Sequence, residues 1–318
     1  MKEHLKEYVE RSSSPAVRGL RILLEYFYAT EIFERIHRNK SKVISVFGSA
    51  RTMPESPEYR LAYKVGSLLY GSGFAVVTGA SRGIMQAANQ GVADAIARDA
   101  VRLKKAATPE MARKTAFYKT LLRQHSVGLS ISLPMESDNN PFVGVSATFH
   151  YFMVRKFFFG TLSSGFIACE GGWGTRDELF EILTLVQTGK APVMPIVYLS
   201  PDPKHLQADL QHTLRKKYIA PDDLHLIHLV RTPEEASRII KQFYRVVDKI
   251  EYDREQSIRV FLKKTIPLHC RKAVEHLLQK NHEGPLVAEW KARELSLFRY
   301  APHSYGSFRK AMDLLNQA

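Results

Sequence analysis

Residues 165–175 read GFIACEGGWGT, a short apolar run that passes directly into a glycine-rich turn. The next residues, Arg176–Gln187, have the composition and spacing of a helix, so the stretch predicts a strand, a tight loop and a helix. Glycines in such a turn let the backbone approach an anion, and the helix N-terminus adds unpaired N–H groups and a positive dipole end. We therefore expect the loop Gly171–Thr175 to seat a phosphate group.

Similar apolar runs of strand length lie on both sides of this unit, each followed by turn residues and a helical segment. They are Val43–Phe47, Phe74–Val77, Val127–Leu133, Val193–Leu199 and Leu224–Val230. These runs are solidly apolar and do not alternate, as expected for parallel strands covered on both faces. The predicted fold class is α/β: a Rossmann-like parallel sheet with helices on both faces, plus helical N- and C-terminal extensions.

Three regions of the chain are expected. Residues 1–40 are predicted to form a helical extension, with apolar positions from Leu20 to Ile36 at mostly helical spacing. Residues 41–248 form the Rossmann-like domain, which carries a basic insertion at about residues 97–125. Residues 249–318 are charged, and we expect a helical, basic C-terminal extension.

The formal charge of +14 is concentrated in the basic insertion and the C-terminal segment. Residues 98–123 hold eight Lys/Arg against two acidic residues, and residues 241–318 hold fifteen against nine. The N-terminus lacks the apolar core of a signal peptide, no stretch approaches the ~20 apolar residues of a membrane span, and the chain has two cysteines. A cytoplasmic location without membrane contact is expected.

Three further loops follow strands and are therefore expected at the same edge of the sheet, where ligands bind in open α/β folds. The first is Gly48–Arg51, and the second is Thr78–Gly83. The third follows Leu133 and contains Pro134, Glu136 and Asn140. None of these loops fits the Walker pattern or a full GxGxxG, which disfavours ATPase and NAD-dependent chemistry.

Local patterns leave some roles open. Thr175 and Glu178 have the spacing of a capping box, so Glu178 either completes the helix or also faces the anion site. A helix is expected over Phe149–Phe159, with a mostly buried aromatic stripe that is also a candidate contact surface. His125, His150 and Cys169 lack partners at metal-ligand or catalytic spacing and are interpreted as structural.

Taken together, these segments resemble the Lonely Guy (LOG) family, whose members are often mislabelled as lysine decarboxylases. The resemblance runs from about residue 42 to 245. It rests on five stretches of sequence: residues 46–51 (VFGSAR), 78–89, 130–136 (SISLPME), 152–156 (FMVRK) and 171–181 (GGWGTRDELFE).

The resemblance implies hydrolysis of the N-glycosidic bond of nucleoside 5′-monophosphates, which gives free base and ribose 5-phosphate. It implies Arg155 and Glu178 as the catalytic pair, since a carboxylate can stabilise an oxocarbenium-like state. No cofactor or metal is expected, and the resemblance implies a homodimer or larger homo-oligomer. The residues expected to bind substrate and phosphate are Gly48, Ser49, Gly79, Arg82, Gly83, Met153, Lys156, Gly171, Gly172, Gly174 and Thr175.

The chain departs from the family pattern in three places. Glu170 stands where members usually carry proline, which puts a negative charge next to the expected phosphate site. The usual TGGGxG loop is replaced by Thr78–Gly83, in which Arg82 is a candidate phosphate contact. A basic stretch, residues 97–125, replaces a short glycine turn.

Two alternatives remain beside the hydrolase. The altered loop and Glu170 are compatible with a non-catalytic nucleotide sensor of the same fold. The basic insertion and tail are compatible with nucleic-acid binding, but no recognised nucleic-acid module is present, and this reading is disfavoured.

Overall fold

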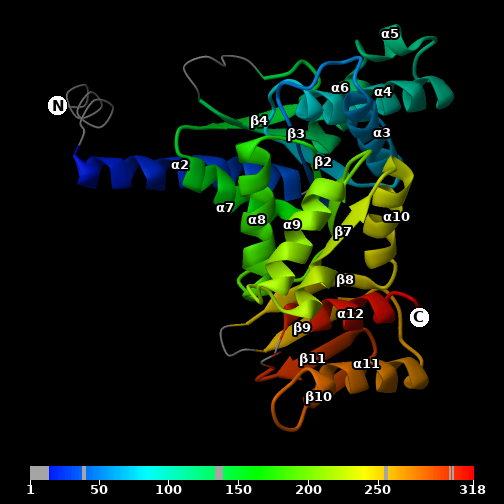
Figure 1. Cartoon of the computed structure of the whole chain (residues 1–318). Helices are drawn as coiled ribbons and strands as arrows, with labels where there is room; N and C mark the ends of the chain where they lie inside the picture. The colour runs from blue at the N-terminus through cyan, green and yellow to red at the C-terminus, as the bar shows by residue number, and fades with distance from the viewer. Residues whose placement is uncertain (1–13, 38–40, 133–138, 254–256, 301, 303) are drawn as a thin grey trace.

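The structure is a computed structural model that describes residues 14–37, 41–132, 139–253, 257–300, 302 and 304–318. A body built on a parallel sheet is joined to a smaller C-terminal unit, and the N-terminal helix projects to one side (Figure 1). Pro134 and Glu136, which were expected in the third loop, lie outside the described residues.

The body contains a seven-stranded parallel sheet in the order β4-β3-β2-β1-β5-β6-β7. Its strands are β1 (Val43–Phe47), β2 (Ala75–Thr78), β3 (Ser126–Ile131), β4 (Val145–Phe149), β5 (Ser163–Cys169), β6 (Ile196–Leu199) and β7 (Ile227–Val230). All six predicted strands are present, and the predicted Rossmann-like fold is confirmed. The solidly apolar runs are buried because helices cover both faces of the sheet.

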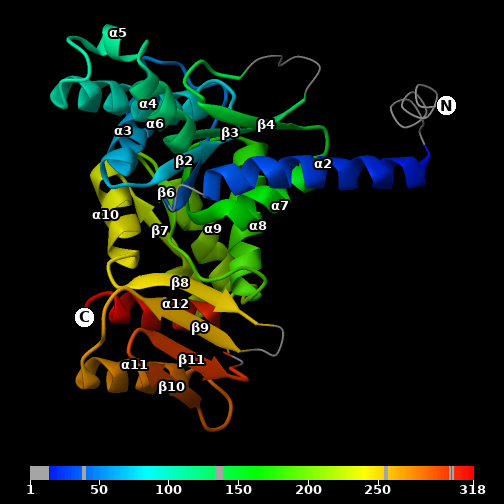
Figure 2. The ribbon, with the colours of Figure 1, turned by 180° about the vertical axis from the view of Figure 1, so that it is seen from behind.

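Two groups of helices cover the sheet. Three helices pack together on one face: α3 (Pro57–Gly71), α4 (Ile84–Arg102) and α10 (Pro233–Phe243). The opposite face carries α7 (Phe152–Leu162), α8 (Trp173–Gln187) and α9 (Lys204–Arg215), as the two views show (Figures 1 and 2). The chain runs outward from β1 to β4 and then returns to β5 on the other side of β1. The sheet therefore has its topological switch point between β1 and β5.

The expected helix over Phe149–Phe159 is wrong at its start. Phe149 ends β4, which pairs with β3, and the helix begins at Phe152. β-branched residues at Val145 and Thr148 favour the extended edge strand. The aromatic stripe also differs from expectation, because Phe152, Met153 and Phe157 are 50–63% exposed.

The basic insertion is helical where it is described. The end of α4 is followed by α5 (Pro109–Ala112) and α6 (Ala116–His125). The residue before each of these two helices is a threonine whose hydroxyl accepts a hydrogen bond from a backbone N–H of the first turn. Arg113 pairs with Asp94 at 2.5 Å, which ties the insertion back to α4.

The expectation of a purely helical C-terminal extension is wrong, because the segment contains an antiparallel sheet. Its elements are β8 (Val247–Tyr252), β9 (Ile258–Leu262), α11 (Leu268–Lys280), β10 (Val287–Lys291), β11 (Glu294–Phe298) and α12 (Tyr305–Leu315), with strand order β10-β11-β9-β8. Along β9, Ile258 and Val260 are buried, whereas Arg259 between them is exposed. That alternation has the period of a strand, so the charged residues lie on the solvent-exposed face of a sheet.

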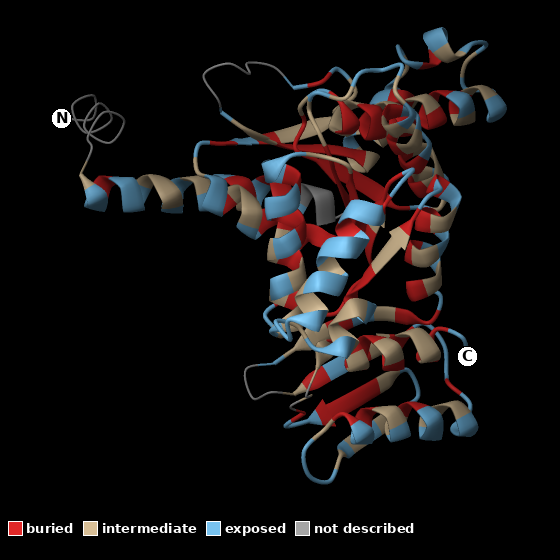
Figure 3. Ribbon diagram, in the orientation of Figure 1, coloured by how far each residue is buried: buried red, intermediate tan, exposed pale blue. Residues whose placement is uncertain are grey.

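The predicted N-terminal helix is present as α2 (Pro15–His37). Its end packs on the body through Ala29, Ile32 and Phe33, but Leu23 and Phe27 are 54% and 63% exposed. Exposed and intermediate surface therefore covers most of this helix (Figure 3). The side chain of Ile36 lies outside the described part. No helix of the described residues is both long and apolar enough to cross a membrane.

Candidate active site

A cavity of about 1140 Å³ opens at the carboxyl ends of the strands, next to the switch point between β1 and β5. It is lined by Gly48–Arg51 after β1, by Gly79–Ser81 after β2, and by Gly172–Thr175 after β5. Arg155 of α7 and Glu178 of α8 complete it. The fold thus brings together three glycine-containing loops and the pair of charged residues that the sequence singled out.

The loop after β1 is fixed by both of its neighbours. The Ser49 N–H donates to the Glu170 carbonyl at 3.0 Å, and the Ser49 carbonyl accepts from the Ile84 N–H at 3.1 Å. Gly83 has φ +64, and a Cβ there would lie 2.2 Å from the Ser49 carbonyl oxygen. A Cβ on Gly48 would lie within 2.7 Å of the Ile84 side chain. These two glycines therefore permit a close approach that a larger residue would prevent.

The loop after β2 rests on a buried network of amides. Thr78 donates to Asn89 Oδ1 at 2.7 Å, and Asn140 Nδ2 donates to the carbonyls of Ala80 and Ser81 at 3.1 Å. Ala80 has φ +63, a conformation that costs an alanine energy. The network holds this strained turn in place. Asn140 is therefore a support of the cavity wall that the sequence placed nearby without assigning a role.

The predicted capping box at Thr175 is wrong. Helix α8 begins at Trp173, Gly172 is its N-cap, and no side chain caps it. Thr175 is thus the third residue of the helix. Its hydroxyl lies close to Gly171, because a Cβ added to Gly171 would be 2.1 Å from Thr175 Oγ1. The first amides of a helix have no partners within it, and here they face a cavity. An uncapped, glycine-flanked helix start of this kind suits an anion.

Glu178 and Arg155 form a buried pair at the cavity wall. Arg155 Nη2 lies 3.4 Å from Glu178 Oε1, and the two side chains are 13% and 7% exposed. Burial raises the pKa of Glu178 to about 7, although the charges of Arg155 and Lys156 oppose the shift. The Arg155 guanidinium carbon also lies 5.0 Å from the centroid of the Phe152 ring, a cation–π contact. A carboxylate that titrates near neutral pH can stabilise positive charge or orient a hydroxyl.

Other residues expected in the site lie outside its lining. Lys156 faces away and pairs with Asp177 at 2.7 Å and Glu181 at 3.0 Å. Met153 and Lys156 line a different cavity. Arg82 is exposed and is not among the residues that line the cavity. Gly83 and Gly171 are also absent from the lining, and both lie close to Ser49 of the loop after β1.

Glu170 does not put its charge into the cavity. Its Oε1 accepts a hydrogen bond from the Ser200 hydroxyl at the end of β6, and it is absent from the cavity lining. Burial raises the pKa of Tyr198, and the negative charge of Glu170 adds to that shift. The departure from proline at this position is therefore compatible with an anion at Gly171–Thr175.

Several lining residues were not assigned by sequence. Trp173 is 92% exposed at the start of α8, and Arg51 and Phe152 border the same space. Ser130 and Thr148, joined by a 2.9 Å hydrogen bond, come from β3 and β4. Trp173 and Arg51 lie inside the motifs already quoted, whereas Thr148 depended on a strand that the sequence did not reveal. No group of metal-ligating side chains with suitable geometry occurs among the described residues.

The fold and this cavity define a Rossmann-like α/β protein with a glycine-loop site at its topological switch point. Residues 85–240 match the family described as "Possible lysine decarboxylase", and residues 41–107 match the SLOG cluster 4 family. Both matches agree with the resemblance to the LOG family that the motifs carry.

Two proteins from Oryza sativa subsp. japonica are similar to the chain. Both are called probable cytokinin riboside 5′-monophosphate phosphoribohydrolases, and they are 30% and 29% identical over 108 residues. The match covers 32% of this chain and 44% and 43% of those proteins, so it spans less than half of their length.

Solved structures with a similar arrangement include the molybdenum cofactor binding protein from Rippkaea orientalis, with 21% identity and a TM-score of 0.41 over 63% of this chain and 96% of that one. The molybdenum cofactor carrier protein of Chlamydomonas reinhardtii has 19% identity and a TM-score of 0.40 over 64% and 97%.

Proposed function

We propose that the protein hydrolyses the N-glycosidic bond of nucleoside 5′-monophosphates to a free base and ribose 5-phosphate. The observation that carries the proposal is Glu178, a carboxylate 7% exposed, at the wall of a large cavity and 3.4 Å from Arg155. The same cavity contains an uncapped helix start suited to the 5′-phosphate. The names of the rice relatives support this class of substrate.

The proposed chemistry assigns each group one task. The amides of Gly172–Thr175 hold the phosphate, and this remote binding energy fixes the ribose for attack. Deprotonated Glu178 stabilises the positive charge that develops on the ribose as the C1′–N bond breaks, and it orients the ribose hydroxyls or the attacking water. Water adds its oxygen to C1′, and its proton leaves with the base. Arg155 positions Glu178 and contacts the ligand.

The deciding experiment is a panel of purine and pyrimidine nucleoside monophosphates, analysed by chromatography for released base. We expect release by the wild type and loss of at least about 10²-fold in Glu178→Gln, since the charge that stabilises the transition state is removed. Asp177→Asn is the matched control, because Asp177 is a neighbouring carboxylate that does not line the cavity. If no nucleotide yields base at high enzyme concentration, the catalytic proposal is rejected.

The alternative function is a non-catalytic nucleotide sensor. The observation in its favour is the altered Thr78–Gly83 loop, in which Ala80 keeps a left-handed conformation where the family has glycine. The same panel separates the two functions. Calorimetric binding of a nucleotide without base release favours the sensor.

We further propose that the protein self-associates through an apolar face shared by α2 and α7. Leu23 and Phe27 of α2 and Phe152 of α7 are all at least 50% exposed. Tyr26 packs against Phe157 with ring centroids 5.5 Å apart, which makes the face continuous between the helices. Helix α7 also carries Arg155, so a second copy on this face would lie close to the proposed site.

A further inference from the structure

A second cavity, of about 610 Å³, lies at the opposite edge of the parallel sheet from the proposed active site. Its floor is formed by Ser163 and Ser164 at the start of β5, and Met194 precedes β6. Its far wall comes from β8 of the C-terminal unit, through Val247–Ile250. The cavity therefore lies between the two parts of the molecule, a common position for a ligand site.

Gly160 opens this cavity. It stands within α7, where a glycine lowers helix stability relative to alanine. Packing does not require it, since a Cβ there would meet only the Leu185 side chain, at an ordinary distance of 3.9 Å. Leu185 lines the same cavity. A larger residue would thus stabilise the helix and fill the space, which suggests that the empty volume has a use.

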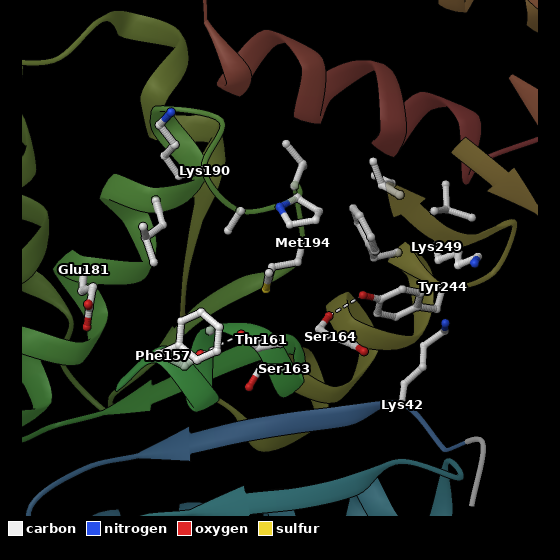
Figure 4. A pocket seen from close by; sticks show the side chains of 18 of the residues that line it. Lys42, Phe157, Thr161, Ser163, Ser164, Glu181, Lys190, Met194, Tyr244 and Lys249 are labelled. Atoms are coloured by element: carbon white, nitrogen blue, oxygen red, sulfur yellow. Dashed lines mark hydrogen bonds between the residues drawn. The ribbon is translucent and has the colours of Figure 1, made fainter. Parts of the chain in front are cut away.

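The lining combines apolar walls with four lysines and two acidic residues. Three of the lysines have acidic partners, because Lys42 pairs with Asp248, Lys156 with Asp177 and Glu181, and Lys249 with Glu251. Lys42, Lys249 and Tyr244 lie on one side, Lys190 and Phe157 lie on the opposite side, and Met194 lies between them (Figure 4). Tyr244 is held by a hydrogen bond to the Ser164 carbonyl. Lysines at the rim and apolar side chains in the centre match a small organic anion with a flat or apolar body.

Lys156 connects this cavity with the proposed active site. It lines the second cavity, while the adjacent Arg155 lines the first. Its ammonium group pairs with Asp177 and Glu181, which flank Glu178 on α8. An anion bound in the second cavity would compete with these carboxylates for Lys156.

We propose that the second cavity is a binding site for a small organic anion with an apolar or aromatic body, distinct from the nucleotide cavity. Its binding properties do not depend on the proposed hydrolysis. An influence on Glu178 through Lys156 would rest on that function.

The test uses the full chain and the fluorescent aromatic sulfonate 1-anilinonaphthalene-8-sulfonate as the probe. We expect saturable binding by the wild type, at least tenfold weaker binding by Gly160→Leu, and unchanged binding by Gly160→Ala. Lys190→Glu should weaken binding several-fold, since it reverses one charge at the rim. Gly160→Leu should unfold no more easily than the wild type, which excludes misfolding as the cause.

Controls separate this cavity from the other apolar and anionic sites. Phe27→Ser on the exposed face of α2 and saturating ribose 5-phosphate should both leave the titration unchanged. Displacement by nucleotides or by octanoate then identifies the natural class of anion. Equal binding by Gly160→Leu and the wild type, or equal loss in Gly160→Ala, would overturn the proposal, and neither result depends on base release.

Discussion

Glu178 shows how strongly surroundings change a single carboxylate. Its usual pKa is 4.5, and burial raises it to about 7 against the opposing charge of Arg155. The residue therefore passes between neutral and charged forms within the physiological range. A capping glutamate on an exposed helix would stay charged, so the shift is a property of the cavity and not of the motif.

The pH dependence of activity should follow this pKa. We expect kcat/KM to rise through pH 7, because deprotonated Glu178 is the active form. The substrate phosphate titrates near pH 6, so the rising limb of the pH profile of kcat/KM does not by itself identify Glu178 as the titrating group. Arg155→Gln removes a charge that lowers the pKa of Glu178, and it should move the limb to higher pH. A limb that stays in place in this variant would contradict the assignment.

The same carboxylate should reduce stability at high pH. A raised folded-state pKa contributes stability that is complete below the unfolded value of 4.5 and is lost as pH rises through about 7. Glu178→Gln lacks this dependence. The quantity to compare is the free energy of unfolding of the variant minus that of the wild type. This difference should increase by up to about 3 kcal/mol from pH 5 to pH 8. Urea titrations at both pH values measure the difference, and a pH-independent difference would refute the prediction.

At the scale of elements, the site depends on how closely its loops approach one another. Gly83 has a φ of +64, and a Cβ added there would lie 2.2 Å from the Ser49 carbonyl oxygen. The glycine therefore joins the end of β1 to the start of α4. The third loop joins the same structure through Asn140, whose backbone N–H also donates to Ala80.

Substitution of Gly83 should be costly. We expect Gly83→Ala to lower the free energy of unfolding by about 2–4 kcal/mol, because strain and a backbone clash act together. Gly71→Ala at the end of α3 is the control, since a Cβ there meets nothing within 4 Å. Denaturant unfolding measures both variants. Equal stability of the two would show that the loops adjust freely.

At the scale of the whole molecule, one buried arginine joins the C-terminal unit to the body. Arg309 of α12 is 1% exposed, and it donates to the Met194 carbonyl at 2.8 Å while it pairs with Asp313. It also lies 3.0 Å from His228 of β7, and burial lowers the pKa of that histidine to about 4, followed by the effect of the Arg309 charge. Met194, whose carbonyl accepts from Arg309, also lines the second cavity.

Self-association should depend on the exposed face of α2. We expect the wild type to run as a dimer or larger species in light scattering coupled to size exclusion, and Leu23→Ser/Phe27→Ser to shift it toward monomer. Burial of large apolar side chains drives such contacts. Leu103→Ser is the control, because Leu103 is 51% exposed at the end of α4, away from this face. An unchanged mass in the double variant would place the interface elsewhere.

Sequence by itself determined the parallel sheet and the identity of its central loops. Largely apolar runs such as Val43–Phe47, in which only Ser45 is polar, are buried on both faces, and their period and turn residues are local properties. The motifs around Arg155 and Glu178 could likewise be read from sequence. The C-terminal sheet was not predicted, although the alternation along β9 has the period of a strand. Its β8–β9 and β10–β11 pairs join neighbouring segments, whereas the β9–β11 pair joins segments far apart in the chain and depends on tertiary structure.

Tertiary structure alone decided where charges and empty space lie. In the folded chain Glu170 contacts Ser200, and Lys156 lines a second cavity. Helix α8 begins at Trp173 and not after Thr175. Each outcome depends on contacts between segments far apart in sequence, which local patterns do not encode. Burial, and with it the pKa of Glu178, exists only once those segments have packed together.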